Sequence, residues 1–163
     1  FEGTGVELAK RIGLAWSKED PDHQTTLSSF VTTMTVTPEG HDSPILSGFP
    51  KQFELHDELY WPLVGDRSEI TILATAEGPK DLGQRGRYPQ DGQPGPEEMD
   101  GNAWPVAWTK QVGKGKVFGT IMGHNFFAFN DPYFRIMLLR GMAWTLDESF
   151  DPFKPLVTMH LQR

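Results

Sequence analysis

The chain has 163 residues, of which 37% are hydrophobic and 23% are charged, with a net charge of -7 and no cysteine. This size and balance predict one folded domain with its own hydrophobic core. The acidic charge, without a dense cluster of lysine and arginine, argues against a nucleic-acid partner. The lack of cysteine excludes disulfides, thiolate metal sites and a cysteine nucleophile. No run of about 18 apolar residues occurs, so we expect no membrane insertion.

The first half of the chain predicts one helix followed by extended segments. Apolar residues recur at near-helical spacing over 6–16, with Gly13 near the expected end of the helix. The sequence FVTTMTV over 30–36 alternates as a half-buried strand does, with Phe30, Thr32, Met34 and Val36 on one face. Further along, we expect a loop over 37–48, a short strand or extended segment over 53–60, and a strand over 69–76.

The second half begins with a long segment, 77–102, that holds four prolines and six glycines. A loop of this length is usually functional or mobile, so we interpret it as a surface excursion or lid. Two strands are expected over 104–110 and 116–122, joined by a tight glycine-containing turn. A helix is expected over 131–146, because Asp131 is a good N-cap and Pro132 suits the first helical position.

Three ordered sequence blocks are more specific than these patterns. Residues 105–124, PVAWTKQVGKGKVFGTIMGH, combine a proline-led strand, a Gly-X-Gly turn, a second strand and a Gly-His pair. Upstream, FELHDELY over 53–60 follows PILSGFP, and downstream FRIMLLRGMAWTLDE over 134–148 forms the closing helix. Together these blocks resemble the ThuA-like family of trehalose utilisation, over roughly residues 30–157.

The resemblance implies an α/β fold similar to class I glutamine amidotransferases, with a flavodoxin-like layered sheet. Those enzymes use a cysteine nucleophile, so their chemistry is not expected in this cysteine-free chain. The family's first strands have no counterpart here. We therefore expect residues 1–163 to form a single domain that is an N-terminally incomplete copy, equivalent to the family's C-terminal two-thirds. The family's His-Pro pair is replaced by Ser43-Pro44, with His41 two residues earlier.

His124 is the first candidate catalytic residue. It follows a strand that we expect to be parallel, and open α/β sheets bind ligands beyond the carboxyl ends of their strands. An imidazole suits acid–base chemistry near neutral pH. Gly123, just before it, lets the backbone turn sharply or approach a ligand closely. The alternative is a histidine that only caps a turn.

A second candidate cluster follows from His56 to Trp61. In an extended segment His56, Glu58 and Tyr60 share one face, and Asp57 points the other way. We expect His56 and Glu58 to act in catalysis, because a carboxylate can orient an imidazole. Tyr60, Asp57 and Trp61 are expected to bind the substrate, since aromatic faces stack on sugar rings. The alternatives are a solvated acidic turn, or a divalent metal held by histidine and carboxylate.

The resemblance implies a protein of carbohydrate metabolism whose partner is a small sugar. Its substrate would be a disaccharide or a 3-keto-glycoside, and its chemistry acid–base catalysis or hydrolysis without a cofactor. The alternatives are a non-catalytic carbohydrate-binding or accessory module, and a fragment that pairs with a missing N-terminal segment or forms a homo-oligomer. Residues 144–160 resemble ThuA-like proteins that bacteria often export, which favours a periplasmic or secreted location.

Overall fold

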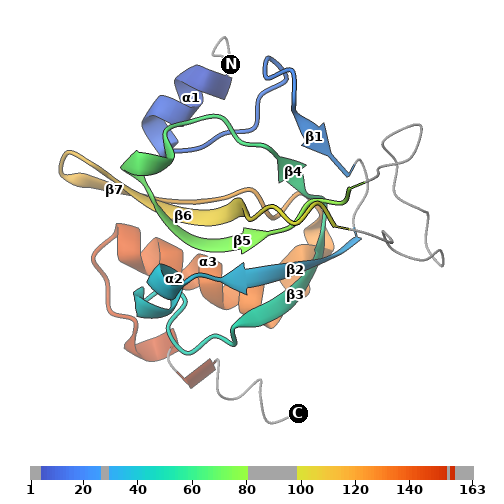
Figure 1. The fold of residues 1–163 in the computed structure, drawn as a ribbon. Coiled ribbons are helices and arrows are strands. Elements are labelled where there is room, and N and C mark those ends of the chain that lie inside the picture. The colour runs from blue at the N-terminus through green and yellow to red at the C-terminus, as the bar shows by residue number, and fades with distance from the viewer. Residues whose placement is uncertain (1–4, 27–29, 81–98, 154, 157–163) are drawn as a thin grey trace.

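A curled five-stranded sheet with helices packed against it forms the centre of the chain (Figure 1). The computed structural model describes residues 5–26, 30–80, 99–153 and 155–156. Within these residues the strand order is β3-β2-β5-β6-β7, and each neighbouring pair is antiparallel. The strands span Phe30–Val36 (β2), Gln52–Asp57 (β3), Thr71–Ala76 (β5), Trp104–Val112 (β6) and Gly115–Thr120 (β7). A separate two-stranded ribbon pairs β1, Gln24–Thr25, with β4, Tyr60–Trp61.

The mixture of helices and strands confirms the predicted α/β class, but the expectation of a parallel strand over 116–122 is wrong. β7 runs antiparallel to β6, with Val112 paired to Gly115 across the turn. Gly113 in this turn has a φ of 58°, a conformation that glycine adopts without steric cost. Parallel neighbours need a crossover of a dozen or more residues, and this connection is far too short for one.

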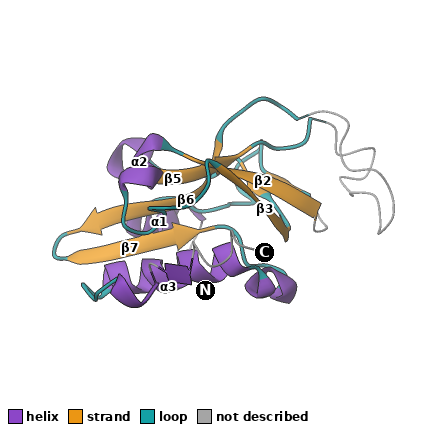
Figure 2. Ribbon diagram, turned by 90° about the horizontal axis from the view of Figure 1, so that it is seen from below, coloured by secondary structure: helices purple, strands orange, loops and turns teal. Residues whose placement is uncertain are grey.

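The long helix α3, Pro132–Thr145, lies against the sheet along β7 (Figure 2). It begins as predicted, because the Asp131 carboxylate accepts a hydrogen bond from the backbone N–H of Phe134 at 2.9 Å. Phe134 and Met137 on this helix are completely buried in the main core. On β2, Thr32, Met34 and Val36 are buried, as the alternation predicts. A short 3₁₀ segment, Asp151–Phe153, follows α3.

The first helix, α1, spans Gly5–Ile12 and ends earlier than the predicted 6–16. Gly13 stops it, because its φ of 102° is incompatible with a right-handed helix. Ala15 then exchanges two backbone hydrogen bonds with Val64, of 3.0 and 2.8 Å. The chain after α1 is thereby extended, and a second, smaller hydrophobic cluster joins it to β6. That cluster consists of Leu14, Leu63 and Trp108, with Trp16, Ile70 and Ile121 packed against it.

A short helix, α2, spans Pro38–Asp42 inside the segment that was expected to be a loop over 37–48. Thr37 caps it, since its hydroxyl accepts a hydrogen bond from the backbone N–H of Gly40 at 2.9 Å. Gly40 faces β5, where a side chain would overlap the backbone carbonyl of Leu73. Gly40 therefore permits close contact between α2 and the sheet.

The long glycine- and proline-rich segment leaves and rejoins the sheet at adjacent points. Pro79 forms a bridge with Met99, and the N–H of Asp100 donates to the carbonyl of Gly78 at 2.8 Å. Residues 81–98, which carry most of the predicted lid, lie outside the described residues, so the lid stays a prediction.

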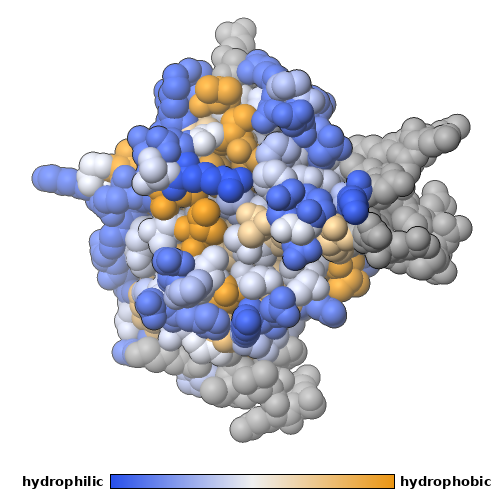
Figure 3. Space-filling model, in the orientation of Figure 1, coloured by the Kyte–Doolittle hydropathy of each residue, from blue (hydrophilic) through white to orange (hydrophobic). Residues whose placement is uncertain are grey.

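On the face shown in Figure 3, hydrophobic residues form small separate patches among hydrophilic ones. No helix in the described ranges is both long and apolar enough to cross a bilayer.

Candidate functional site

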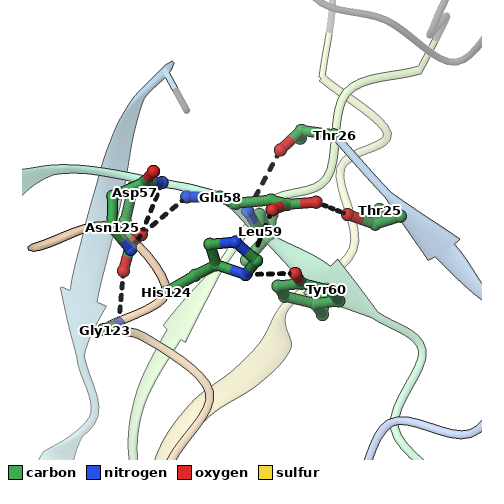
Figure 4. Close-up of polar contacts among 9 residues, drawn as sticks. All are labelled: Thr25, Thr26, Asp57, Glu58, Leu59, Tyr60, Gly123, His124 and Asn125. Atoms are coloured by element: carbon green, nitrogen blue, oxygen red, sulfur yellow. Dashed lines mark hydrogen bonds and ion pairs between the residues drawn. The ribbon is translucent and has the colours of Figure 1, made fainter. Parts of the chain in front are cut away.

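The candidate site lies where the link between β3 and β4 meets the loop after β7 (Figure 4). His124 follows the carboxyl end of β7, and its Nδ1 is 2.6 Å from the Tyr60 hydroxyl and 3.3 Å from Oε2 of Glu58. The rings of Tyr60 and His124 stack with centroids 5.9 Å apart and an interplanar angle of 22°. His124 thus lies in direct contact with two predicted site residues, Glu58 and Tyr60, from a distant part of the sequence.

Asp57 holds the loop that carries His124. Its side chain is completely buried, and Oδ1 accepts hydrogen bonds from the backbone N–H of Glu58 and of Asn125, both at 2.9 Å. The same oxygen accepts from the side-chain amide of Asn125 at 3.1 Å, and Oδ2 accepts from the backbone N–H of Gly123. The expected role of Asp57 in substrate binding is therefore not supported by its position. Its carboxylate is enclosed and occupied by the chain itself.

Gly123 makes the sharp turn that the sequence predicts before His124. Its φ is 110°, which a residue with a side chain rarely adopts. A Cβ atom at this position would also lie 3.2 Å from the ring of Phe134. The glycine lets the chain turn after β7, so that the loop binds the Asp57 carboxylate and carries the imidazole of His124.

Glu58 supplies a buried carboxylate behind the imidazole, with 9% of its side chain exposed. Its Oε1 accepts a hydrogen bond from the hydroxyl of Thr25 in β1. Thr26, which follows Thr25 in the chain, forms two hydrogen bonds with Leu59. Its hydroxyl accepts from the N–H of Leu59 at 3.2 Å, and its own N–H donates to the carbonyl of Leu59 at 3.1 Å. Sequence reasoning missed both threonines, because a two-residue strand within the polar segment 17–26 has no periodic pattern.

Tyr60 remains protonated over the physiological range. Its pKa is raised well above the ordinary value, first by burial and then by its hydrogen bond to Glu58 and the charge of that carboxylate. The other edge of its ring meets Trp16, with centroids 5.3 Å apart in a T-shaped arrangement. Trp16 packs in the same way on His23. This aromatic side of the site was not predicted, since Trp16 was expected to lie at the end of a helix.

His56 does not join the cluster. It is exposed on β3 and packs its ring on Phe127, with centroids 4.9 Å apart. The expectation that His56, Glu58 and Tyr60 share one face is wrong, because β3 ends at Asp57 and the alternation of side chains ends with it. Glu58 is buried in the link to β4, whereas His56 faces outward.

Trp61 is a core residue in this structure. Only 4% of its surface is exposed, and its ring packs so closely on Gly78 that a Cβ atom there would overlap it. An enclosed ring offers no face to a sugar, so the predicted substrate-binding role of Trp61 has no support in its position. Trp108 is likewise a core residue, with 2% of its surface exposed.

The resulting arrangement is a half-exposed imidazole in contact with a buried carboxylate and a tyrosine hydroxyl. The His124 side chain is 54% exposed. Its Nδ1 faces Tyr60 and Glu58, and its Nε2 has no hydrogen-bond partner among the described residues. Such a group can take a proton from a ligand or give one to it at Nε2. Within the described ranges no three histidine or carboxylate side chains form a metal-binding cluster, and the absence of a cofactor stays a prediction.

Comparison with known proteins places these observations in a family. A crystal structure of a ThuA-like protein from Parabacteroides merdae is similar in fold, with a TM-score of 0.54 and 22% sequence identity. The match covers 81% of this chain and 46% of that one, so the chain spans about half the length of this neighbour. No curated protein matches the chain. The ThuA family, described as trehalose utilisation, matches residues 6–145. By that match, which extends further towards the N-terminus than the three sequence blocks, the chain belongs to the ThuA family of trehalose utilisation.

Proposed function

We propose that this protein acts on a disaccharide or a 3-keto-glycoside by acid–base catalysis at His124. The observation that supports the proposal most strongly is the contact of His124 with Glu58 and Tyr60, in a chain of the trehalose-utilisation family. A buried carboxylate, a neutral phenol and a solvent-facing imidazole form a set of groups that can hold and transfer one proton.

The hydrogen bonds favour one arrangement of protons. Tyr60 stays neutral, and its hydroxyl donates a hydrogen bond to Glu58, which as a carboxylate can only accept. Nδ1 of His124 then carries a proton, which points to the Tyr60 oxygen at 2.6 Å and to Glu58 at 3.3 Å. In a neutral imidazole this leaves a lone pair on Nε2, facing solvent. His124 is thereby prepared as a general base.

A 3-keto-sugar suits such a base, because a C–H bond next to a ketone is acidified by delocalisation of the carbanion onto the carbonyl oxygen. Nε2 of His124 would take that proton, and Glu58 would balance the charge of the imidazolium. When the glycosidic C–O bond next to the carbanion breaks, the imidazolium returns the proton to the leaving oxygen. For an intact disaccharide the same nitrogen would instead activate a water molecule. Either role is worth about 10²–10⁴-fold in rate.

The test compares the wild-type chain with His124→Ala and with His41→Ala, an exposed histidine at the end of α2. Each protein is incubated with a panel of disaccharides and 3-keto-disaccharides, and products are measured by mass spectrometry. We expect His124→Ala to lower turnover by about 10²–10⁴-fold and His41→Ala to match the wild type. Equal turnover by all three proteins would remove His124 from the mechanism.

Calorimetry on the same panel separates catalysis from simple recognition. If the wild-type chain binds a sugar and forms no product, the protein is a carbohydrate-binding module and the catalytic proposal is wrong. If it forms product, the dependence on His124 decides whether the proposed base is the correct one.

A further inference from the structure

We infer that Thr25 is a positioning residue that fixes the Glu58 carboxylate in the orientation in which it faces His124. The catalytic meaning of this role rests on the proposed function. The positioning of Glu58 by Thr25 does not depend on that function, because the proton position on the His124 imidazole can be measured without any substrate. No pattern in the sequence connects Thr25 with Glu58, which lies 33 residues further along the chain.

Each oxygen of Glu58 has a different neighbour. Oε1 accepts the hydrogen bond from the hydroxyl of Thr25, and Oε2 lies 3.3 Å from Nδ1 of His124 (Figure 4). A carboxylate is acceptor-only, so the hydroxyl must be the donor in its bond to Oε1. With Oε1 bound on the side of β1, the remaining oxygen is directed at the imidazole.

The backbone holds Thr25 where this contact requires it. Thr25 pairs with Tyr60 across the β1–β4 ribbon, and Tyr60 follows Glu58 closely in the chain. The two hydrogen bonds between Thr26 and Leu59 fasten β1 to the residue that follows Glu58. The threonine hydroxyl, the carboxylate and the phenol are therefore set by one short piece of paired backbone.

Loss of the hydroxyl would leave the carboxylate with its hydrogen bond from Tyr60 but without its donor on the side of β1. A buried carboxylate oxygen without a donor is costly, because it has been removed from water without compensation. Glu58 has torsions about which it can rotate to regain a partner, and such a rotation would carry Oε2 away from His124. A fixed carboxylate, by contrast, needs no reorganisation when the imidazole becomes charged.

The measurable consequence is the proton position on His124. With Glu58 in place, the proton of the neutral imidazole lies on Nδ1. If Glu58 turns away, the preference for Nδ1–H weakens and the Nε2–H form increases. Nitrogen-15 NMR of the imidazole distinguishes the two forms, and His124 is assigned among the five histidines by the signal lost in His124→Gln.

The experiment uses three variants of the whole chain. Thr25→Val keeps the shape and removes the hydroxyl, Thr25→Ser keeps the hydroxyl, and Thr26→Val removes the hydroxyl that accepts from Leu59 in the same ribbon. We expect Thr25→Val to lower the ratio of Nδ1–H to Nε2–H by about tenfold, the order of one lost charge-assisted hydrogen bond. The other two variants should stay within about twofold of the wild type. Circular dichroism confirms that each variant is folded, and Thr25→Ala replaces Thr25→Val if the latter does not fold.

Two results would overturn the inference. One is an unchanged ratio in Thr25→Val; the other is an equal change in Thr25→Val and Thr26→Val, which would show a general effect of strand pairing. A double-mutant cycle supplies a further check: in a Glu58→Gln background, Thr25→Val should change the ratio no further, since the two residues act as one unit. A protein that turns over no sugar but shows these shifts would refute the proposed function and leave the role of Thr25 intact.

Discussion

Replacement of Asp57 by asparagine should destabilise the fold and displace His124 at the same time. The completely buried carboxylate accepts four hydrogen bonds from the loop 123–125 and from Glu58. In Asp57→Asn, one oxygen can keep the three donors at Oδ1, but an NH₂ group then faces the N–H of Gly123. The loss of one charge-assisted bond costs about 1.5–3 kcal/mol, and the unpaired buried donor about 1–3 kcal/mol. Together they lower the free energy of unfolding by about 2.5–6 kcal/mol.

Urea unfolding followed by tryptophan fluorescence measures this loss. With an m-value of about 1–3 kcal/mol/M, the midpoint of Asp57→Asn should fall by about 2 M. The control is Asp131→Asn at the start of α3, where the side chain accepts one bond from Phe134. Asparagine caps helices about as well as aspartate, so this variant should lose less than about 0.5 kcal/mol. If Asp57→Asn lost no more than Asp131→Asn, the carboxylate would not be what holds the loop.

Three further predictions concern stability and the residues around the site. The raised pKa of Tyr60 means that the stabilisation linked to its protonated form is complete below about pH 10 and is lost as the pH rises towards the folded-state pKa. Between about pH 10 and pH 12 the Tm of the wild type should therefore fall more steeply than that of Tyr60→Phe, and parallel curves would contradict this. Gly141→Ala places a methyl group against the Phe118 ring, which should cost about 1–3 kcal/mol in thermal unfolding, whereas an unchanged Tm would show that α3 does not pack closely on β7. His56→Ala removes an exposed ring that packs on Phe127, so turnover should stay within about twofold; a loss as large as that of His124→Ala would return His56 to the site.

Local sequence signals were enough to predict a helix with a clear N-cap and a strand whose side chains alternate clearly between buried and exposed. The Asp131–Pro132 pair predicts the start of α3, and the alternation FVTTMTV predicts β2 from its first residue to its last. The turn at Gly123 also followed from residue type and sequence motif. In each case the determining interaction lies within a few residues of the pattern that predicts it.

Features that depend on distant contacts could not be predicted. The helix α2, for example, depends on the contact of Gly40 with β5. The end of β3 at Asp57 decides which side chains meet, and it separates His56 from Glu58. Thr25 reaches Glu58 only because a two-residue ribbon forms between distant segments, and such a ribbon has no periodicity of its own.

The most direct test of the central claim is hydrogen–deuterium exchange at the carbon next to the ketone of a 3-keto-disaccharide. In deuterated water the wild-type chain should incorporate deuterium at that carbon, because Nε2 of His124 removes the proton and exchanges it with solvent. His124→Ala should slow this incorporation by about 10²-fold or more. Incorporation at the same rate with and without the imidazole would contradict the account.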